Sequence, residues 1–180
     1  MPAFNFVTLD TETTGFSSRD EVLSCGVVDP EGNTLIDTLI KTQYKKSWFH
    51  AQQVHNISPA DVALNGIGYD QFLEQLAAKI QPFKSIVIYN AQFDLRFFPA
   101  DFFKNHLVIC AMKHSVKFLA EHPYREAIPK AIKQAALAEL LQIQTSDLSL
   151  HSSRDDAELC RRIWRQILEE SQRYSINLPY

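Results

Sequence analysis

Residues 4–15 read FNFVTLDTETTG, and the interpretation of the whole chain starts from them. Residues 4–9 are apolar or β-favouring and form a run short enough for a buried strand. The strand ends at Asp10 and Glu12, whose side chains point to the same face because side chains alternate along a strand. Anions held side by side at the edge of an apolar core repel each other and are costly to desolvate, and Mg²⁺ or Mn²⁺ relieves that cost. The alternative is a strand that runs into a polar turn, with both acids solvated.

Composition bounds the class of protein. The chain has 180 residues, 46% hydrophobic and 22% charged, which fits one soluble globular domain over residues 1–180. A net charge of −3 provides no global basic field, so nucleic-acid binding requires a local groove or metal ions. The odd number of cysteines (Cys25, Cys110 and Cys160), each in an apolar stretch, indicates reduced thiols. No run reaches transmembrane length and no signal peptide is evident, so we expect a cytoplasmic protein.

The expected elements are strands first, then alternating helices and strands. Strands are expected over residues 4–9, 21–29, 33–41, 85–89 and 107–110, with a turn at 30–33. Helices are expected over residues 49–54, 58–63, 69–80, 111–121, 131–141 and 153–172. A further short helix follows Asn90, which can cap it, and ends before Pro99, while Pro123 and Pro129 bracket a loop. This order predicts an α/β fold with a mixed sheet, antiparallel at its start, flanked by helices.

A second acidic site is expected at Asp94, in the first helical turn after the strand over residues 85–89. An acid there can simply complement the helix dipole, which is worth a few tenths to about 1 kcal/mol. Helix N-termini that follow parallel strands are, however, also where α/β sheets place ligands. The neighbouring aromatic side chains (Phe93, Phe97 and Phe98) are interpreted as core.

The third acidic site lies in HSSRDDAE, residues 151–158. Helical periodicity places Asp156 on the face of the apolar residues, and Asp155 and Glu158 on a solvent face. A carboxylate on a buried face needs a partner, and a metal ion would supply one. The alternative is an acid that caps its own helix, although Ser152 or Ser153 can do so already. His151 lies within reach of whatever Asp156 holds, while a lone loop histidine is ordinarily just exposed.

Four carboxylates and a histidine at the ends of elements suit two-metal phosphoryl transfer. In that chemistry one ion activates the attacking water and the other stabilises the leaving oxygen. A histidine titrates near neutral pH and suits the general base that deprotonates the water.

The segments FVTLDTETTG, YNAQFD and HSSRDDAE resemble the three signatures of the DnaQ-like DEDDh 3′–5′ exonucleases, on an RNase H-like fold. The four-residue gap between His151 and Asp156 matches the histidine subtype rather than the tyrosine subtype. Residues 54–58 (VHNIS) are similar to the family's V-H-G-I-T, and residues 110–113 (CAMK) to exonuclease X-type members. By this resemblance the metal ligands are Asp10, Glu12, Asp94 and Asp156, and the general base is His151. Asn56, in place of glycine, and Tyr89, in place of histidine, depart from the pattern.

The resemblance implies two Mg²⁺ or Mn²⁺ ions and release of nucleoside 5′-monophosphates from 3′ ends of single-stranded nucleic acid, DNA in the first instance. The alternatives are an exoribonuclease and a non-catalytic nucleic-acid- or polymerase-binding module of the same fold; a polymerase or repair protein is a further partner to consider. Phe16 and His55 are candidates for stacking on a base, worth about 1–3 kcal/mol, or are simply a turn aromatic and a loop histidine. The lysines of residues 41–46 are a phosphate contact or a solvated loop. The residues expected to hold the terminal nucleotide are Thr13, Thr14, Gly15, Phe16, His55 and Asn90.

Overall fold

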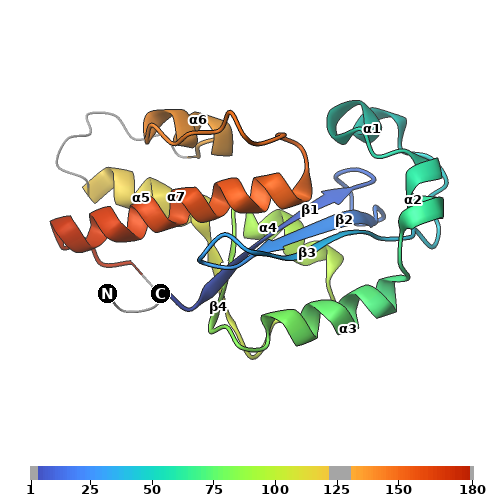
Figure 1. Ribbon diagram of the computed structural model, residues 1–180, viewed down its shortest axis with the longest axis horizontal. Helices are drawn as coiled ribbons and strands as arrows, with labels where there is room; N and C mark the ends of the chain where they lie inside the picture. Colours follow the sequence, from blue (N-terminus) through green and yellow to red (C-terminus); the bar gives the residue numbers. More distant parts are fainter. Residues whose placement is uncertain (1–3, 122–130, 179–180) are drawn as a thin grey trace.

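The computed structural model describes residues 4–121 and 131–178, which form a mixed sheet with helices on both faces (Figure 1). The sheet has five strands in the order β3-β2-β1-β4-β5, so β1 is central. The strands β1, β2 and β3 pair antiparallel, whereas β4 pairs parallel with β1 and β5 parallel with β4. This topology confirms the predicted RNase H-like α/β fold. The strands are β1 (Phe6–Thr13), β2 (Val22–Val28), β3 (Thr34–Leu39), β4 (Ser85–Ile88) and β5 (Leu107–Cys110).

The helices follow the predicted order, with some bounds shifted. They are α1 (Phe49–His55), α2 (Pro59–Asn65), α3 (Tyr69–Ile80), α4 (Ala91–Asp94), α5 (Ala111–Glu121), α6 (Gln134–Leu140) and α7 (Ser153–Tyr174). The bounds of α3, β5 and α5 agree with the predicted ones, whereas α6 begins later than residue 131. A 3₁₀ turn, Leu95–Phe97, follows α4, and Phe98 is extended, as expected for a residue before Pro99. The predicted loop between Pro123 and Pro129 lies outside the described residues.

The C-terminal end of β1 decides where the acids Asp10 and Glu12 lie. β1 continues to Thr13 instead of ending at residue 9, because its ladder with β2 runs on to the pair Thr13 and Val22. Asp10 and Glu12, expected at the end of the strand, therefore lie within it. The alternation that was expected to bring them to one face holds in the regular geometry of a paired strand.

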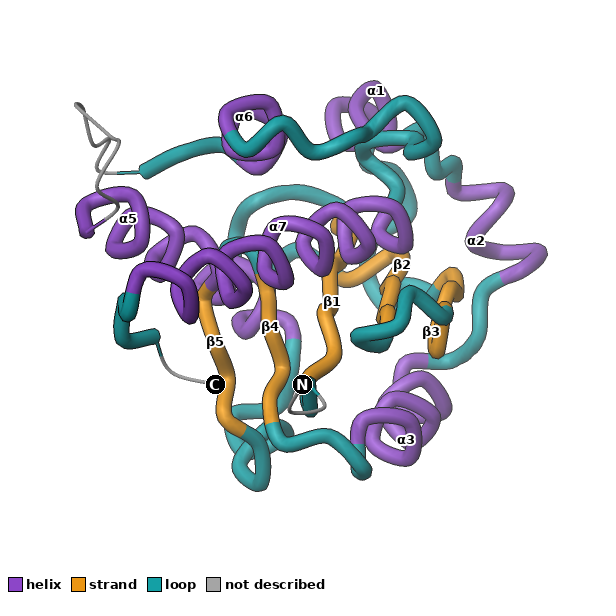
Figure 2. Tube along the Cα trace, turned by 60° about the vertical axis from the view of Figure 1, so that its left-hand side comes forward, coloured by secondary structure: helices purple, strands orange, loops and turns teal. Residues whose placement is uncertain are grey.

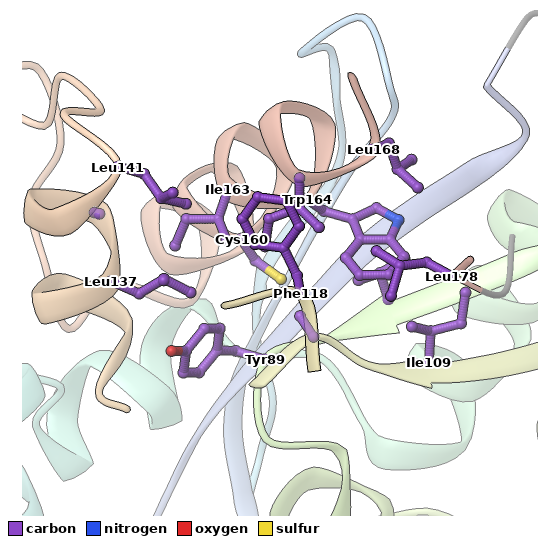
Figure 3. Close-up of a cluster of buried hydrophobic side chains, with 14 of the residues drawn as sticks. Tyr89, Ile109, Phe118, Leu137, Leu141, Cys160, Ile163, Trp164, Leu168 and Leu178 are labelled. Carbon is purple, nitrogen blue, oxygen red and sulfur yellow. The ribbon is translucent and has the colours of Figure 1, made fainter. Parts of the chain in front are cut away.

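The two faces of the sheet carry separate cores. Phe6 of β1 belongs to the cluster beneath α5, α6 and α7, whereas Val7 and Leu9 belong to the cluster against α3. Figure 2 shows α7 crossing one face of the sheet while α3 lies on the other. Figure 3 shows the first cluster, in which Trp164 of α7 is fully buried. Because α7 packs along this core, its N-terminal turn is fixed near the end of β1.

A third, smaller cluster attaches α1 and α2 to the sheet. Leu23 of β2, Trp48 and Val62 of α2 are buried together. The Trp48 indole N–H donates to the carbonyl of Ile57 at 2.8 Å. Ser58 caps α2 through a reciprocal capping box with Asp61. These contacts fix Trp48 as a rigid wall between the sheet and the two helices.

Two expectations about helix ends are wrong. Asn90 occupies the N-cap position of α4, but its side chain makes no capping hydrogen bond. Neither Ser152 nor Ser153 caps α7 with its hydroxyl; the Ser153 hydroxyl instead lies 2.9 Å from that of Ser24 on β2. These hydroxyls join the start of α7 to the sheet.

The predicted solvent face of α7 is also wrong. Glu158 is buried and accepts hydrogen bonds from Arg161 and Arg162. Arg162 also donates to the carbonyl of Gln144, so the segment before α7 covers this face. Asp155 is partly buried as well, because its carboxylate accepts the Ser149 N–H at 2.8 Å. Periodicity within one helix does not reveal a loop that folds back over it.

Among the described residues, no helix has the length and apolar content needed to cross a membrane. The three cysteines are free thiols, and Cys25 and Cys160 are buried.

Candidate active site

Acidic side chains from β1, α4 and α7 meet at one end of the sheet. The carboxylates of Glu12 and Asp156 and the imidazole of His151 offer ligand atoms that all lie within 4.8 Å of one another. Asp94, only 4% exposed, accepts a hydrogen bond from the Thr11 hydroxyl at 2.7 Å, which ties α4 to β1. Asp10 lies close enough to the other three acids for each of them to raise its pKa. The elements that bear these residues are distant in sequence, and the sheet brings them together.

The electrostatics of the cluster are unfavourable without cations. Burial raises the pKa of Asp10 well above its ordinary value, and the charges of Asp94, Asp156 and Glu12 raise it further. Burial, followed by Asp156 and Asp94, raises the pKa of Glu12 to about 7. Burial also raises the pKa values of Asp94 and Asp156. Hard divalent cations bind oxygen ligands of this kind, so the donor set fits Mg²⁺ or Mn²⁺.

Gly26 allows α7 to approach the sheet at this point. It pairs with Asp10 across the β1–β2 ladder. A Cβ atom at Gly26 would lie 2.3 Å from the Ser153 carbonyl oxygen and 2.4 Å from Arg154 Cα. Real Cβ atoms do not approach backbone so closely, so any side chain here would displace the first turn of α7. The position of Asp156 therefore depends on a glycine in a neighbouring strand.

The backbone of His151 adopts an uncommon conformation. Its φ of 67° lies in the left-handed region, which non-glycine residues rarely occupy. Its N–H donates to the Asp156 carboxylate at 3.1 Å. The chain thus turns back sharply before α7, and the exposed imidazole of His151 lines the cavity described next. Strained backbone of this kind persists where surrounding contacts over-determine it, and it clusters at functional sites.

A cavity of about 710 Å³ opens beside Glu12 and His151. Of the residues expected to bind the terminal nucleotide, it is lined by Thr13, Thr14, Gly15, Phe16 and His55. Asn90 is not among its lining residues. Sequence reasoning missed several apolar walls of the cavity: Trp48, Phe49, Ala51, Val54 and Phe93. The only local signal was the pair of aromatics Trp48-Phe49 directly after a polar connection.

The two candidate stacking residues differ in their surroundings. His55 is 8% exposed; its Nδ1 accepts the Ile57 N–H at 3.0 Å, which leaves Nε2 to donate to the Thr13 carbonyl at 3.2 Å. Its imidazole thus braces β1 against the end of α1. Phe16 is 82% exposed, and its ring lies 5.9 Å from that of Phe93. Phe16 therefore presents an open face to a base, whereas most of the surface of His55 is already covered.

Two residues, Asn56 and Phe93, differ from the family pattern or from the expected burial. Asn56, which stands in place of glycine, has a φ of 59°. Asparagine tolerates this left-handed conformation better than most residues, so the turn after α1 keeps its shape. Phe93, expected in the core, is partly exposed, and the Arg96 guanidinium lies 4.7 Å from its ring centroid.

A mixed sheet with helices on both faces and an acidic cluster beside its central strand is the architecture of an RNase H-like α/β protein. A family model described as "Exonuclease" (RNase T) matches residues 7–163. The chain therefore belongs to the RNase T exonuclease family, and it is a DnaQ-like 3′–5′ exonuclease, as its motifs predicted. No curated protein matches the sequence.

Solved structures show the same fold at low sequence identity. Exonuclease X in complex with 5′ overhanging duplex DNA is 20% identical, with a TM-score of 0.68, and the match covers 93% of each chain. Exonuclease I of E. coli in a zinc-bound complex with single-stranded DNA is 16% identical, with a TM-score of 0.77. That match covers 96% of this chain but 42% of exonuclease I. A complex of E. coli exonuclease I with a dT13 oligonucleotide is 16% identical with a TM-score of 0.72, and covers 95% and 42% of the two chains.

Proposed function

We propose that the protein removes nucleotides one at a time from the 3′ end of single-stranded DNA and releases nucleoside 5′-monophosphates. The observation that carries this proposal is the convergence of four mutually repelling carboxylates beside His151 at the mouth of an apolar-walled cavity. Structures of the same fold solved with 5′ overhanging duplex DNA, at 20% identity, and with a dT13 oligonucleotide, at 16% identity, favour DNA as the substrate.

The residues have distinct roles in this proposal. Asp10, Glu12, Asp94 and Asp156 would hold two divalent cations, Mg²⁺ or Mn²⁺. Such ions, when bound, neutralise the phosphodiester and acidify water. His151 accepts the proton of the water that attacks phosphorus, and the bond from phosphorus to the 3′ oxygen breaks. The leaving 3′ oxygen takes a proton from solvent, so the shortened strand leaves with a 3′-hydroxyl. The cavity walls hold the terminal nucleoside, with Phe16 available to stack on its base.

The direct test is a time course on a 5′-labelled single-stranded DNA oligomer with Mg²⁺ or Mn²⁺. We expect a ladder of products shortened from the 3′ end, nucleoside 5′-monophosphate as the released product, and no reaction in EDTA. Asp10→Asn should abolish the ladder, whereas Asp101→Asn, a matched change at an exposed loop carboxylate, should not.

Assays of other substrates under the same conditions distinguish the proposed activity from an exoribonuclease and from a non-catalytic binding module. A matched RNA oligomer degraded much faster than the DNA would identify an exoribonuclease, and a duplex would report tolerance of a second strand. Absence of any degradation by the parent, together with tight DNA binding, would favour a binding module and would overturn the proposal.

A further inference from the structure

A second hollow lies on the other side of Trp48. Its volume is about 290 Å³, and its walls come from the connection between β3 and α1 and from α2. Trp48, 5% exposed, lines both this hollow and the main cavity and so separates them. The residues that line the second hollow include Lys41, Lys45 and Lys46. We call it the lysine hollow.

The two hollows differ in charge. Among the described residues, no lysine or arginine lines the main cavity. Lys41 and Lys46 are exposed, and neither forms an ion pair within the parts of the chain that the structure describes, residues 4–121 and 131–178. Lys45 alone is neutralised, by Asp20 at 2.9 Å. The net charge of the chain is −3. The ammonium groups of Lys41 and Lys46, next to the uncharged side chain of Trp48, therefore create a local positive potential that favours an anion.

Hydrogen bonds hold in place the connection between β3 and α1, which carries the three lysines. The Glu21 carboxylate accepts the backbone N–H groups of Gln43, Tyr44 and Lys45, the first at 2.6 Å. The Lys41 N–H donates to the Ile67 carbonyl at 2.8 Å, and the Thr42 hydroxyl to the Lys45 carbonyl at 2.7 Å. A connection fixed in this way presents its ammonium groups without a large ordering cost on binding.

The same connection is joined to the turn that lines the main cavity. Asp20, the partner of Lys45, also accepts the Thr14 hydroxyl at 2.9 Å and the Ser17 N–H at 2.8 Å. A Cβ atom on Gly15 would lie 2.8 Å from the Asp20 carboxylate. The lysine hollow and the main cavity therefore keep a fixed position relative to each other.

We propose that Lys41 and Lys46 bind backbone phosphates of the substrate strand upstream of its 3′ end. This inference rests on the proposed function. With the terminal nucleotide beside Glu12 and His151, the remaining strand must leave the main cavity, whose described lining residues include no lysine or arginine for its phosphates. Trp48 lines both hollows, so a strand that leaves over this side chain meets Lys41 and Lys46, which form no ion pair within the described residues. Arg96, a further cation near the mouth, is already engaged, because it donates to the Phe16 carbonyl at 3.2 Å and covers the Phe93 ring.

The test compares a substrate that reaches the lysine hollow with one that does not. The first is a 5′-labelled 12-nucleotide DNA strand, and the second is thymidine 5′-(4-nitrophenyl phosphate), which has no upstream phosphate. For Lys41→Gln/Lys46→Gln we expect KM for the 12-mer to rise about tenfold and the slope of log KM against log salt to fall by about 1.4, about 0.7 for each phosphate that the variant no longer neutralises. Hydrolysis of the nitrophenyl ester should not change.

Matched variants separate charge from structure. Lys79→Gln/Lys84→Gln, which removes two lysines at the end of α3 and just after it, should leave KM for the 12-mer unchanged. Lys41→Arg/Lys46→Arg should keep the parent KM, because the charge is retained. A glutamine variant with the parent KM and salt slope would overturn the inference, as would a defect that arginine does not rescue.

A binding measurement keeps the two proposals distinguishable. Fluorescence anisotropy of the labelled 12-mer in EDTA reports strand binding without turnover, and the glutamine variant should bind about tenfold more weakly. If the parent hydrolyses neither substrate but shows this lysine-dependent binding, the proposed function fails and the phosphate site stands. If the parent hydrolyses both and the variants bind equally, the phosphate site fails and the function stands.

Discussion

Glu12→Gln should stabilise the metal-free protein at pH 8, although it removes a proposed ligand. Burial and the charges of Asp156 and Asp94 raise the pKa of Glu12 from 4.5 to about 7. Each tenfold change in proton affinity corresponds to about 1.4 kcal/mol, so ionised Glu12 costs the folded, metal-free protein up to about 3 kcal/mol. Glutamine has a similar shape and carries no charge, so it avoids this cost.

The direction of the pKa shift decides how the stability of the metal-free protein changes with pH. Because the pKa is raised in the folded state, the protonated carboxyl contributes stability that is complete below pH 4.5 and is lost as pH rises through about 7. The parent should therefore become less stable across this window in EDTA. The free energy of unfolding of Glu12→Gln should equal that of the parent at pH 4.5 and exceed it by about 2–3 kcal/mol at pH 8.

Urea unfolding in EDTA, followed by tryptophan fluorescence, measures the effect, since Trp164 is fully buried. The midpoints at pH 4.5 and pH 8 convert to free energies of unfolding through a slope that should be the same for all variants. Glu74→Gln, at an exposed position of α3, is the control and should track the parent. A Glu12→Gln variant that is less stable than the parent at pH 8 would refute the reasoning, because it would mean that the carboxylate stabilises the metal-free fold.

Three further perturbations test other parts of the site. Gly26→Ala should lower the free energy of unfolding by about 1–3 kcal/mol and lower kcat, because its methyl group would meet the backbone of Ser153. Gly68→Ala, at the N-cap of α3 with no atom within 4 Å, should cost less than about 1 kcal/mol in urea unfolding and leave kcat unchanged. His151→Ala should reduce kcat by about 10²–10⁴ with little change in Mn²⁺ affinity, measured by turnover and calorimetry; a comparable loss of metal affinity would contradict its role as a base. Phe16→Ala should raise KM for single-stranded DNA by an amount equivalent to about 1–3 kcal/mol and leave the melting temperature unchanged, and an unaltered KM would exclude stacking on its ring.

Local patterns were sufficient for much of the fold. The apolar spacing of α3 and the alternating strands follow from contacts that repeat along one element, so their periods are visible in the sequence. The bounds of α3 agree with prediction, and its residues Phe72, Leu76 and Ile80 are buried. The motif acids are recognisable because they lie in three short segments, FVTLDTETTG, YNAQFD and HSSRDDAE, that resemble the signatures of the family. Their assignment as metal ligands stays a prediction.

Contacts between segments that are distant in the sequence were not predictable. Glu158 was placed in solvent because nothing in its helix reveals the segment that covers it. The aromatic wall at Trp48 and Phe49 depends on where α1 docks, which the cluster of Leu23 with Val62 decides. The role of Gly26 was likewise hidden, since its importance lies in the distance to a helix 127 residues further along the chain, at Ser153. Such features belong to tertiary packing rather than to local sequence.

Calorimetric titration of the EDTA-stripped protein with Mn²⁺ tests the central claim most directly. The acidic cluster should bind two ions for each chain, with heat that disappears in Asp10→Asn and persists in Asp101→Asn. A parent that takes up no Mn²⁺, or an Asp10→Asn variant that binds it as the parent does, would contradict the assignment of this cluster as the metal centre of the exonuclease.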